Sequence, residues 1–361
     1  MNLLRHFPKD RFSFDIVVSE DDTAIFDDDL KELGARKIVT LKKKYGSPAL
    51  RTAANVFSLW RVIREGNYAI AHFNVCHGVE LVYVFLAKLA GIPKRIVHCR
   101  NNDIGAGGKS RQIKILAHKI CKQLFSRSAN VKLANSALAA KWLFTERDIR
   151  RGNVSVIHNG IEMEKYRFRE DVRESMRSRL GVGTKTVVGH IGHFNYQKNH
   201  EFLLKIFAAY TRYDPESVLL LIGEGEEEEK TKALAGSLGI AEKVLFAGVT
   251  KDIPPYLWAM DVFVFPSRFE GFGNVLIEAQ AAGLECFASK DVIPEAVQIT
   301  DALNWIPLTD SAEEWAKKIA SERKPRDRVG QYHTAAASRY SIDRMADALS
   351  RIYAAPEERA K

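Results

Sequence analysis

The sequence predicts an α/β protein built from two doubly wound parallel sheets. Its 361 residues are enough for about two domains of roughly 150 residues each. In both halves, short runs rich in Val, Ile and Leu alternate with amphipathic helical patterns. Strands of this composition are buried on both faces, so we expect parallel sheets covered by helices on either side.

The expected strands follow one another regularly along each half. The first half contains the candidate strands FDIVVS, RKIVTL, YAIAHF, RIVHCR, NVKLAN and NVSVIH, with helical patterns over residues 48–64 and 78–90. The second half contains TVVGHIG, SVLLLIG, KVLFAG, DVFVFPS and ECFAS, with a helix expected after each strand.

The domain boundary is expected within residues 158–171, where Asn159-Gly160 is a turn signal. We therefore assign residues 1–160 to a first domain and 161–338 to a second. Residues 339–361 are expected to form a helix that returns to the first domain. In this helix Ser341 is the candidate N-cap, and one face carries Met345, Leu349, Ile352 and Tyr353.

Charge is distributed unevenly between the halves. Residues 1–160 hold 27 Lys and Arg against 14 Asp and Glu, a net +13, whereas the remainder carries a net −4. Residues 104–145 contain eight Lys or Arg and no acid. The first half is therefore predicted to meet an anionic partner.

Cysteine usage and hydropathy indicate the cellular compartment in which the chain is expected. The four cysteines form no C-x-x-C pair, which favours a reducing compartment. The N-terminal sequence MNLLRHFPKDRF lacks a long apolar core, so no signal peptide is expected. The longest apolar run, residues 79–93, is shorter than the ~20 residues that a membrane-spanning helix needs.

The stretch FPSRFEGFGNVLIEAQAAGL, residues 265–284, is the most informative motif. It follows a strand, so residues 268–273 are expected at the carboxyl end of a sheet, where ligands bind. Gly271 and Gly273 allow close backbone approach, and the following helix N-terminus suits a phosphate. Glu278 can accept two hydrogen bonds from a ribose, and Glu270 can accept from sugar hydroxyls. The alternative is a glycine-rich turn with two surface glutamates.

This stretch resembles the E-x7-E motif of retaining glycosyltransferases of family 4, which have the two-domain GT-B fold. GHIGHFNYQKNHEFLLKIF (189–207), LLLIGEGE (219–226) and VIHNGIE (156–162) are also similar to segments of that family. The resemblance implies two Rossmann-like domains facing a cleft, with a C-terminal helix crossing back to the first domain. It also implies retention of anomeric configuration.

The resemblance assigns roles to residues of the second half. Glu278 would hold the ribose, Lys198 would neutralise the diphosphate, and Glu270 would hold the donor sugar. For Asn199, which follows Lys198, the alternative is a cap of the following helix. The remaining donor-site candidates are His193, Glu224, Gly225, Val249, Gly271, Phe272, Gly273, Asn274 and Val275. The catalytic candidates are His98, Glu270 and Lys198, and neither a metal nor a cofactor is expected.

Two features depart from the family pattern. His193 stands where members usually have an arginine, which predicts weaker or pH-sensitive diphosphate binding because histidine is fully charged only below about pH 6.5. The first strand–loop–helix element is expected to be missing, which would remove a central strand from the first sheet.

Histidines at strand ends are further candidates in the first half. His98 and, less strongly, His72 match cleft positions of the family, although a histidine at a strand end is more often structural. The glycine-rich DIGAGGKS (103–110) lacks the first glycine of a P-loop, so we interpret it as a mobile loop.

The segment KSRQIKILAHKICKQLFSRSA, residues 109–129, predicts a basic amphipathic helix. Its apolar stripe is formed by Ile113, Leu116, Ile120 and Leu124. A separate basic face carries Arg111, Lys114, His118 and Lys122, and Lys119 adds to the charge. The pattern indicates binding to an anionic membrane surface. The alternative is a core-packed helix whose basic face is solvated.

Together these features predict a glycosyltransferase that moves a sugar from a nucleotide-sugar, with UDP the expected nucleotide, to a lipid-linked saccharide in surface polysaccharide synthesis. It is expected in the cytoplasm, peripheral on the inner face of the membrane. A non-catalytic homologue and a GT-B-type sugar-nucleotide epimerase are the alternatives. Nucleic-acid binding is not expected, since no recognised motif accompanies the basic charge.

Overall fold

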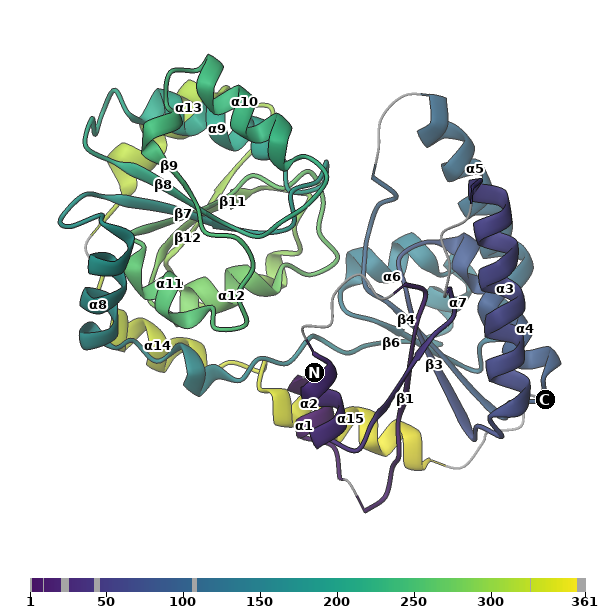
Figure 1. The fold of residues 1–361 in the computed structure, drawn as a ribbon. Helices are drawn as coiled ribbons and strands as arrows, with labels where there is room; N and C mark the ends of the chain where they lie inside the picture. The colour runs from purple at the N-terminus through teal and green to yellow at the C-terminus, as the bar shows by residue number, and fades with distance from the viewer. Residues whose placement is uncertain are drawn as a thin grey trace. The chain divides into compact units, whose positions relative to one another are not determined.

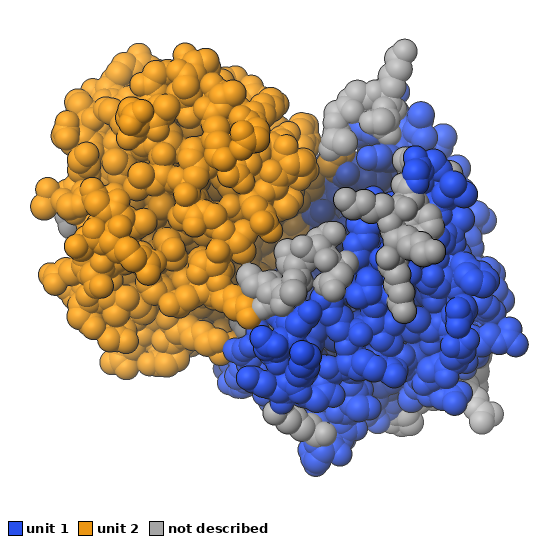
Figure 2. Space-filling model, viewed as in Figure 1, with its two compact units in different colours: residues 1–104, 108–160, 340–361 blue, residues 105–107, 161–339 orange. Residues whose placement is uncertain are grey.

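The computed structural model describes residues 2–8, 10–20, 26–41, 46–105, 109–324 and 326–355. The chain forms two compact units, shown in different colours in Figure 2. Unit 1 comprises residues 1–104, 108–160 and 340–361, and unit 2 comprises 105–107 and 161–339. The glycine loop expected at 103–110 falls partly outside the described residues, which omit 106–108.

Unit 2 contains a six-stranded parallel sheet in the order β12-β11-β10-β7-β8-β9. This is the doubly wound order in which the direction of winding reverses between the first and fourth strands, here β7 and β10. All five strands expected in this half form, and the chain adds β12 as a sixth. The bounds are β7 Val187–Ile191, β8 Val218–Ile222, β9 Val244–Phe246, β10 Val262–Phe265, β11 Glu285–Ser289 and β12 Leu303–Ile306.

Helices cover both faces of this sheet because its strands are apolar on both sides. Figure 1 shows α9, α10 and α13 on one face and α11 and α12 on the other. The bounds are α8 Glu170–Leu180, α9 His200–Tyr210, α10 Glu228–Ser237, α11 Pro254–Ala259, α12 Asn274–Ala281, α13 Ala312–Glu322 and α14 Arg328–Ala336. The short 3-10 turns are η3 Met163–Tyr166, η4 Ala241–Lys243 and η5 Glu295–Val297.

Unit 1 contains all six expected strands, but they form two separate sheets. Strands β3 to β6 make a four-stranded parallel sheet in chain order, whereas β1 and β2 pair only with each other among the described residues. The described chain therefore provides no strand that joins the β1–β2 pair to β3. The bounds are β1 Asp15–Val18, β2 Arg36–Val39, β3 Ile70–Val75, β4 Lys94–Cys99, β5 Val131–Ala134 and β6 Val154–Val156.

Unit 1 contains both helices that the sequence predicts, over residues 48–64 and 78–90. The second forms as a 3-10 turn followed by an α-helix. Helix α4 contacts both α3 and α5, so the three form one layer. The bounds are α1 Asn2–Arg5, α2 Asp27–Glu32, α3 Pro48–Glu65, η1 Gly78–Glu80, α4 Leu81–Leu89, α5 Lys109–Phe125, η2 Ser126–Ser128, α6 Ala137–Leu143 and α7 Glu146–Arg150.

The C-terminal helix α15, Ile342–Ala354, packs on the sheet of unit 1 as expected. Its buried Met345 and Leu349 cluster with Ile96 and Leu133 of β4 and β5. Ser341 is its N-cap, because the hydroxyl accepts from Asp343 N–H. At the other end, the buried Lys94 ammonium donates to the carbonyl oxygens of Ile352 and Tyr353, each at 2.8 Å. The lysine thus satisfies carbonyl groups that have no partner within the helix and complements its dipole.

Candidate active site

The candidate donor site of unit 2 lies at the reversal point between β7 and β10. The loop after β7 carries Lys198 and the loop after β10 carries Glu270, so adjacent strand ends bring the two side chains together. The Lys198 ammonium lies 2.7 Å from the Glu270 carboxylate, and both side chains are mostly buried. The structure thus joins two predicted site residues 72 positions apart at the edge where doubly wound sheets bind ligands.

The course of the Lys198 side chain depends on Gly192. A Cβ atom at Gly192 would lie about 3.0 Å from the lysine stem, so a larger residue would displace that stem. The ammonium lies 4.5 Å from the centre of the Phe265 ring, within range of a cation–π interaction. The Lys198 side chain is therefore held by a carboxylate and an aromatic ring of the same unit.

Glu278 is on α12, behind the turn that carries Glu270. Burial raises the pKa of Glu278 to about 7, although a hydrogen bond from Tyr166 and the charge of Lys198 act in the opposite direction. Tyr166 is buried and was not among the predicted site residues. The signal available in the sequence was its place six residues after Gly160, within the predicted domain boundary of residues 158–171.

The turn between β10 and α12 has the expected backbone freedom at one glycine. Gly273 precedes α12 in a left-handed conformation with φ of 91°, which glycine adopts without steric penalty. The buried Phe272 side chain anchors this turn in the core. Asn274 and Val275 begin the helix, so their backbone groups lie at its N-terminus, where the dipole favours an anion.

The loops after β7 and β8 are in direct contact. Gly223 and Gly225 both have positive φ, and a Cβ atom at Gly225 would lie 2.5 Å from the Phe194 carbonyl oxygen. Only glycine therefore permits this approach. Glu224 is exposed beside it, and Val249 is also exposed after β9, so both predicted base-side residues are accessible.

The contacts of His193 and Asn199 differ from the roles expected for them from the sequence. The exposed His193 lies with its Nε2 atom 3.1 Å from the Glu226 carboxylate. Asn199 occupies the N-cap position of α9, but its side chain makes no capping bond there. Its amide donates instead to the Pro266 carbonyl at 3.0 Å, which ties the loop after β7 to the end of β10. The capping role suggested from sequence is therefore wrong.

The structure places the histidine candidates of the first half below the surface of unit 1. His98 is fully buried, and its ring stacks on that of His72 at 5.4 Å between centroids. Burial and the nearby Arg100 lower the pKa of both histidines, so both are neutral at pH 7. His72 also shares a 2.6 Å hydrogen bond with the Tyr353 hydroxyl of α15. These contacts are structural, and a catalytic role for His98 stays a prediction.

Helix α5 has the predicted amphipathic pattern, but its polar side packs inward. Gly78 N–H donates to His118 Nδ1 at 2.8 Å, so His118 Nε2 carries the proton and donates to the Trp142 carbonyl at 3.2 Å. Lys122 donates to the carbonyls of Lys141 and Trp142 at the end of α6. A Cβ atom at Gly78 would lie 2.4 Å from the His118 carbonyl oxygen, so glycine permits this close packing.

The apolar stripe of α5 faces solvent. The exposed fractions are 70% for Ile113, 60% for Leu116, 49% for Ile120 and 66% for Leu124. Of the four predicted membrane cations, Lys114 and Lys119 are exposed, but Arg111 forms an ion pair with Asp103 and Lys122 binds carbonyl groups. Arg111 and Lys122 thus have partners within the chain, and a membrane or acceptor role for the four cations stays a prediction. The core-packing alternative for the stripe is wrong.

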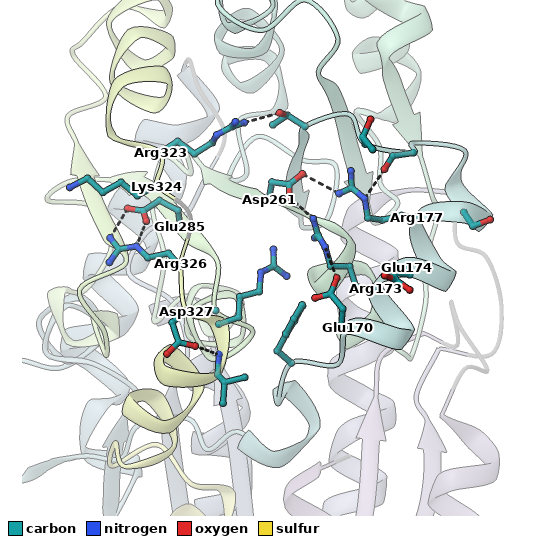
Figure 3. A pocket seen from close by; sticks show the side chains of 18 residues that line it. Glu170, Arg173, Glu174, Arg177, Asp261, Glu285, Arg323, Lys324, Arg326 and Asp327 are labelled. Atoms are coloured by element: carbon teal, nitrogen blue, oxygen red, sulfur yellow. Dashed lines mark hydrogen bonds and ion pairs between the residues drawn. The ribbon is translucent and has the colours of Figure 1, made fainter.

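A cavity of unit 2, about 1070 Å³, lies at the ends of these strands opposite the candidate donor site. Figure 3 shows Arg173 and Arg177 reaching Asp261, and Arg326 reaching Glu285. Arg173 and Arg177 also donate to carbonyl groups at the C-terminus of α11. Because these cations are already satisfied by the chain, they hold α8 against α11 rather than form a donor site.

The comparisons with known proteins agree with this architecture. Residues 171–336 match the model of glycosyl transferases group 1, and residues 1–165 match that of glycosyltransferase family 4. EpsF of Bacillus subtilis, named as a glycosyltransferase, is 27% identical over 323 residues, covering 89% of this chain and 82% of EpsF.

Two further proteins extend the comparison. UDP-Gal:alpha-D-GlcNAc-diphosphoundecaprenol alpha-1,3-galactosyltransferase of Escherichia coli is 26% identical over 256 residues, covering 66% of this chain and 62% of that protein. The structure of HepE from Anabaena, in complex with UDP and glucose, is similar with a TM-score of 0.74 at 20% identity, covering 97% of this chain and 94% of HepE. The chain belongs to the family 4 glycosyltransferases and has the GT-B fold with two Rossmann-like domains.

Proposed function

We propose that this glycosyltransferase moves a sugar from a UDP-sugar to a lipid-linked saccharide in surface polysaccharide synthesis, with retention of anomeric configuration. The observation that carries the donor half is the grouping of Lys198, Glu270 and Glu278 at the reversal point of the unit 2 sheet. The activity for which the Escherichia coli relative is named, with a UDP-sugar and a diphosphoundecaprenol-linked acceptor, supports both substrate classes.

The proposed chemistry uses the charges that the chain itself supplies. Breaking the sugar–phosphate bond leaves negative charge on the diphosphate, so fixed positive groups at the leaving oxygens lower the barrier. Lys198 and the N-terminus of α12 are positioned for this role. A diphosphate that binds Lys198 would compete with Glu270, and this competition frees the Glu270 carboxylate for donor-sugar hydroxyls. No cofactor enters the proposed step.

The donor half is tested by ligand-dependent stability. UDP, GDP, ADP and UDP-sugars are titrated while the thermal unfolding of the full chain is followed. A ligand at 100 times its Kd raises the free energy of unfolding by about 2.7 kcal/mol. We expect stabilisation by UDP and its loss in Glu278→Ala. A folded chain that no nucleotide stabilises would contradict the proposal and favour the non-catalytic homologue.

The transfer itself is tested with a diphosphoundecaprenol-linked saccharide. UDP release only when this acceptor is present supports a transferase, because an epimerase would convert the UDP-sugar without an acceptor. The anomeric configuration of the product, measured by NMR coupling constants, then tests retention. An inverted product would contradict that part of the proposal.

The part of the proposal that concerns the lipid-linked acceptor includes peripheral attachment of unit 1 to an anionic bilayer, with α5 as the contact. Four large aliphatic side chains of α5 face solvent, and Lys114 and Lys119 are exposed beside them. An apolar stripe flanked by lysines suits the boundary of an anionic leaflet, where each cation contributes about 1 kcal/mol. The net +13 of residues 1–160 complements this surface. No helix among the described residues is long and apolar enough to cross a membrane.

The attachment is tested by co-sedimentation of the full chain with phosphatidylglycerol-containing vesicles. Ile120→Glu should weaken binding about tenfold or more, because it removes an aliphatic group and adds a negative charge. The matched control is Tyr213→Glu in unit 2, since Tyr213 is 48% exposed and Ile120 is 49% exposed. Equal loss in both variants, or a dimer that Ile120→Glu dissociates without vesicles, would contradict a bilayer as the occupant.

A further inference from the structure

Arg100 lies directly after β4, at the carboxyl edge of the unit 1 sheet. Its Nε–H donates to the side-chain oxygen of Asn74 at 2.9 Å, and its Nη1 donates to that of Asn159. Asn74 is near the end of β3 and Asn159 follows β6. The backbone N–H of Arg100 also donates to the Val75 carbonyl oxygen at 3.0 Å. The position of the guanidinium is therefore fixed from three strand ends of one sheet.

The Arg100 guanidinium is held by neutral groups. Among the described residues it forms no ion pair, whereas Arg111 of the same unit pairs with Asp103. Burial lowers the pKa of Arg100 to about 10, so the group stays charged at pH 7. Amide oxygens orient a cation without neutralising it. An anion that binds Arg100 would thus gain an attraction for which no carboxylate of the chain competes.

The same guanidinium has hydrogen-bond donors to spare. A guanidinium carries five N–H donors in a planar fork, and the two asparagines use one on Nε and one on Nη1. Within the part of the chain that the structure describes, both hydrogens of Nη2 and one of Nη1 have no partner. Arg100 is partly exposed and Asn74 is exposed, so this edge is open to solvent. Arginine commonly binds two oxygens of a phosphate with such paired donors.

We propose that Arg100 is a phosphate-binding residue, which binds the diphosphate of the lipid-linked saccharide acceptor. This inference rests on the proposed function and specifies how unit 1 recognises the acceptor. The donor diphosphate already has Lys198 and the N-terminus of α12 in unit 2 as its proposed partners. The acceptor brings a second diphosphate, and the net +13 of residues 1–160 favours binding of that anion by the first half.

The first test measures how much affinity the acceptor diphosphate contributes. Binding of farnesyl-diphosphate-linked N-acetylglucosamine and of the phosphate-free farnesyl glycoside to the full chain is measured by calorimetry at pH 7. In the unmodified protein the diphosphate should improve affinity about tenfold or more, because hydrogen bonds between charged partners are strong. In Arg100→Gln this preference should fall to about twofold. Arg100→Lys keeps the charge but loses the paired donors, so its preference should be intermediate.

The matched control is Arg95→Gln, at the amino end of the same strand. Arg95 is also partly buried and also donates to neutral groups, the carbonyl oxygens of Ser128 and Pro93, each at 2.7 Å. The control makes the same chemical change and removes the same charge from β4. If it reduces the preference for the diphosphate as much as Arg100→Gln does, the effect comes from the net charge of unit 1 and the inference is wrong. A loss of folded protein would weaken both farnesyl ligands equally and leave their ratio unchanged.

Two further ligands identify the source of the phosphate. The affinity of Arg100→Gln for UDP should stay within about twofold of that of the unmodified chain, because the donor diphosphate is assigned to unit 2. A tenfold loss of UDP affinity with an unchanged preference for the farnesyl diphosphate would assign Arg100 to the nucleotide instead. Co-sedimentation with phosphatidylglycerol vesicles tests a phospholipid headgroup. Loss of vesicle binding with an unchanged diphosphate preference would also contradict the proposal.

The outcomes separate this inference from the proposed function. If the unmodified chain binds neither farnesyl compound, the proposed lipid-linked acceptor fails and the inference falls with it. If it binds both equally, or if Arg100→Gln retains the preference for the diphosphate, only the inference fails. A preference that is lost in Arg100→Gln, partly kept in Arg100→Lys and retained in Arg95→Gln supports it.

Discussion

Helices α12 and α5 both follow a strand of a parallel sheet and a glycine-containing loop, but they bury opposite kinds of side chain. Helix α12 buries Leu276 and Ile277 in the core and carries Glu278 at the candidate donor site. Helix α5 instead packs His118 and Lys122 against unit 1 and exposes its apolar stripe. Periodicity therefore identifies a helix and its two faces, but it does not determine which face is buried.

The difference has a physical cause in what lies beneath each helix. Helix α12 covers an apolar sheet, so apolar side chains gain most from burial. Helix α5 lies over η1 and the end of α6, where backbone N–H and C=O groups need partners. A histidine and a lysine can satisfy those groups, whereas leucine would leave them buried and unpaired. The apolar stripe of α5 therefore faces solvent.

The largest expected effect concerns the polar residue that α12 does bury. Gln280 is fully buried, accepts from Ile299 and Thr300 N–H, and donates to Leu276 and Val297 carbonyls. Gln280→Leu keeps the side-chain volume but leaves these buried N–H and C=O groups without their hydrogen-bond partner. We therefore expect a loss of about 3 kcal/mol in the free energy of unfolding. Urea unfolding, with hydrogen exchange to locate the loss in unit 2, measures it.

Gln298→Leu is the control for this variant because Gln298 is exposed and its side-chain oxygen accepts from the Trp305 indole N–H. Its effect should stay within about 0.5 kcal/mol. Equal stability of the two variants would show that α12 does not depend on its buried amide, and the contrast with α5 would disappear.

The next effect concerns the buried polar face of α5. His118→Leu removes the acceptor of Gly78 N–H and the donor to the Trp142 carbonyl. We expect the free energy of unfolding to fall by about 2 kcal/mol at pH 7.5, as measured by urea unfolding. A leucine variant as stable as the original would mean that this face tolerates apolar residues and that α5 has no preferred orientation.

The same histidine predicts a pH dependence. Burial, aided by the charge of Lys122, lowers the pKa of His118 to about 4, below its unfolded value of 6.5. The contribution of neutral His118 to the free energy of unfolding is thus complete above pH 6.5. It is lost as the pH falls toward 4, because the unfolded state binds the proton more readily. The difference in the free energy of unfolding between the original chain and His118→Leu should decrease by about 1–2 kcal/mol between pH 7.5 and 5. A gap that widens on acidification would contradict a buried neutral histidine.

Much of the fold could be predicted from sequence because strands buried on both faces are continuous apolar runs. The expected strands all formed, whereas β12, sequence LNWI, was missed because its short run has a polar residue and lies beside a turn. The pairing of Lys198 with Glu270 was not predicted, since the two residues lie 72 positions apart and meet only through strand order. Tyr166 was missed for the same reason, because η3 and α12 come together only in the folded unit.

The smallest expected effect is the most informative about α5. Leu116→Gln replaces an exposed aliphatic side chain with a polar one of similar size, so the free energy of unfolding should change by less than about 0.5 kcal/mol. Leu276→Gln on α12 is the matched change at a fully buried position, and it should cost several times more. If Leu116→Gln instead destabilises unit 1 in urea as strongly, its side chain is buried in solution and α5 has the core-packed orientation that was the alternative interpretation of the pattern. If it leaves stability intact and reduces vesicle binding, the stripe is maintained by function rather than by folding, because its apolar character contributes nothing to unit 1 alone.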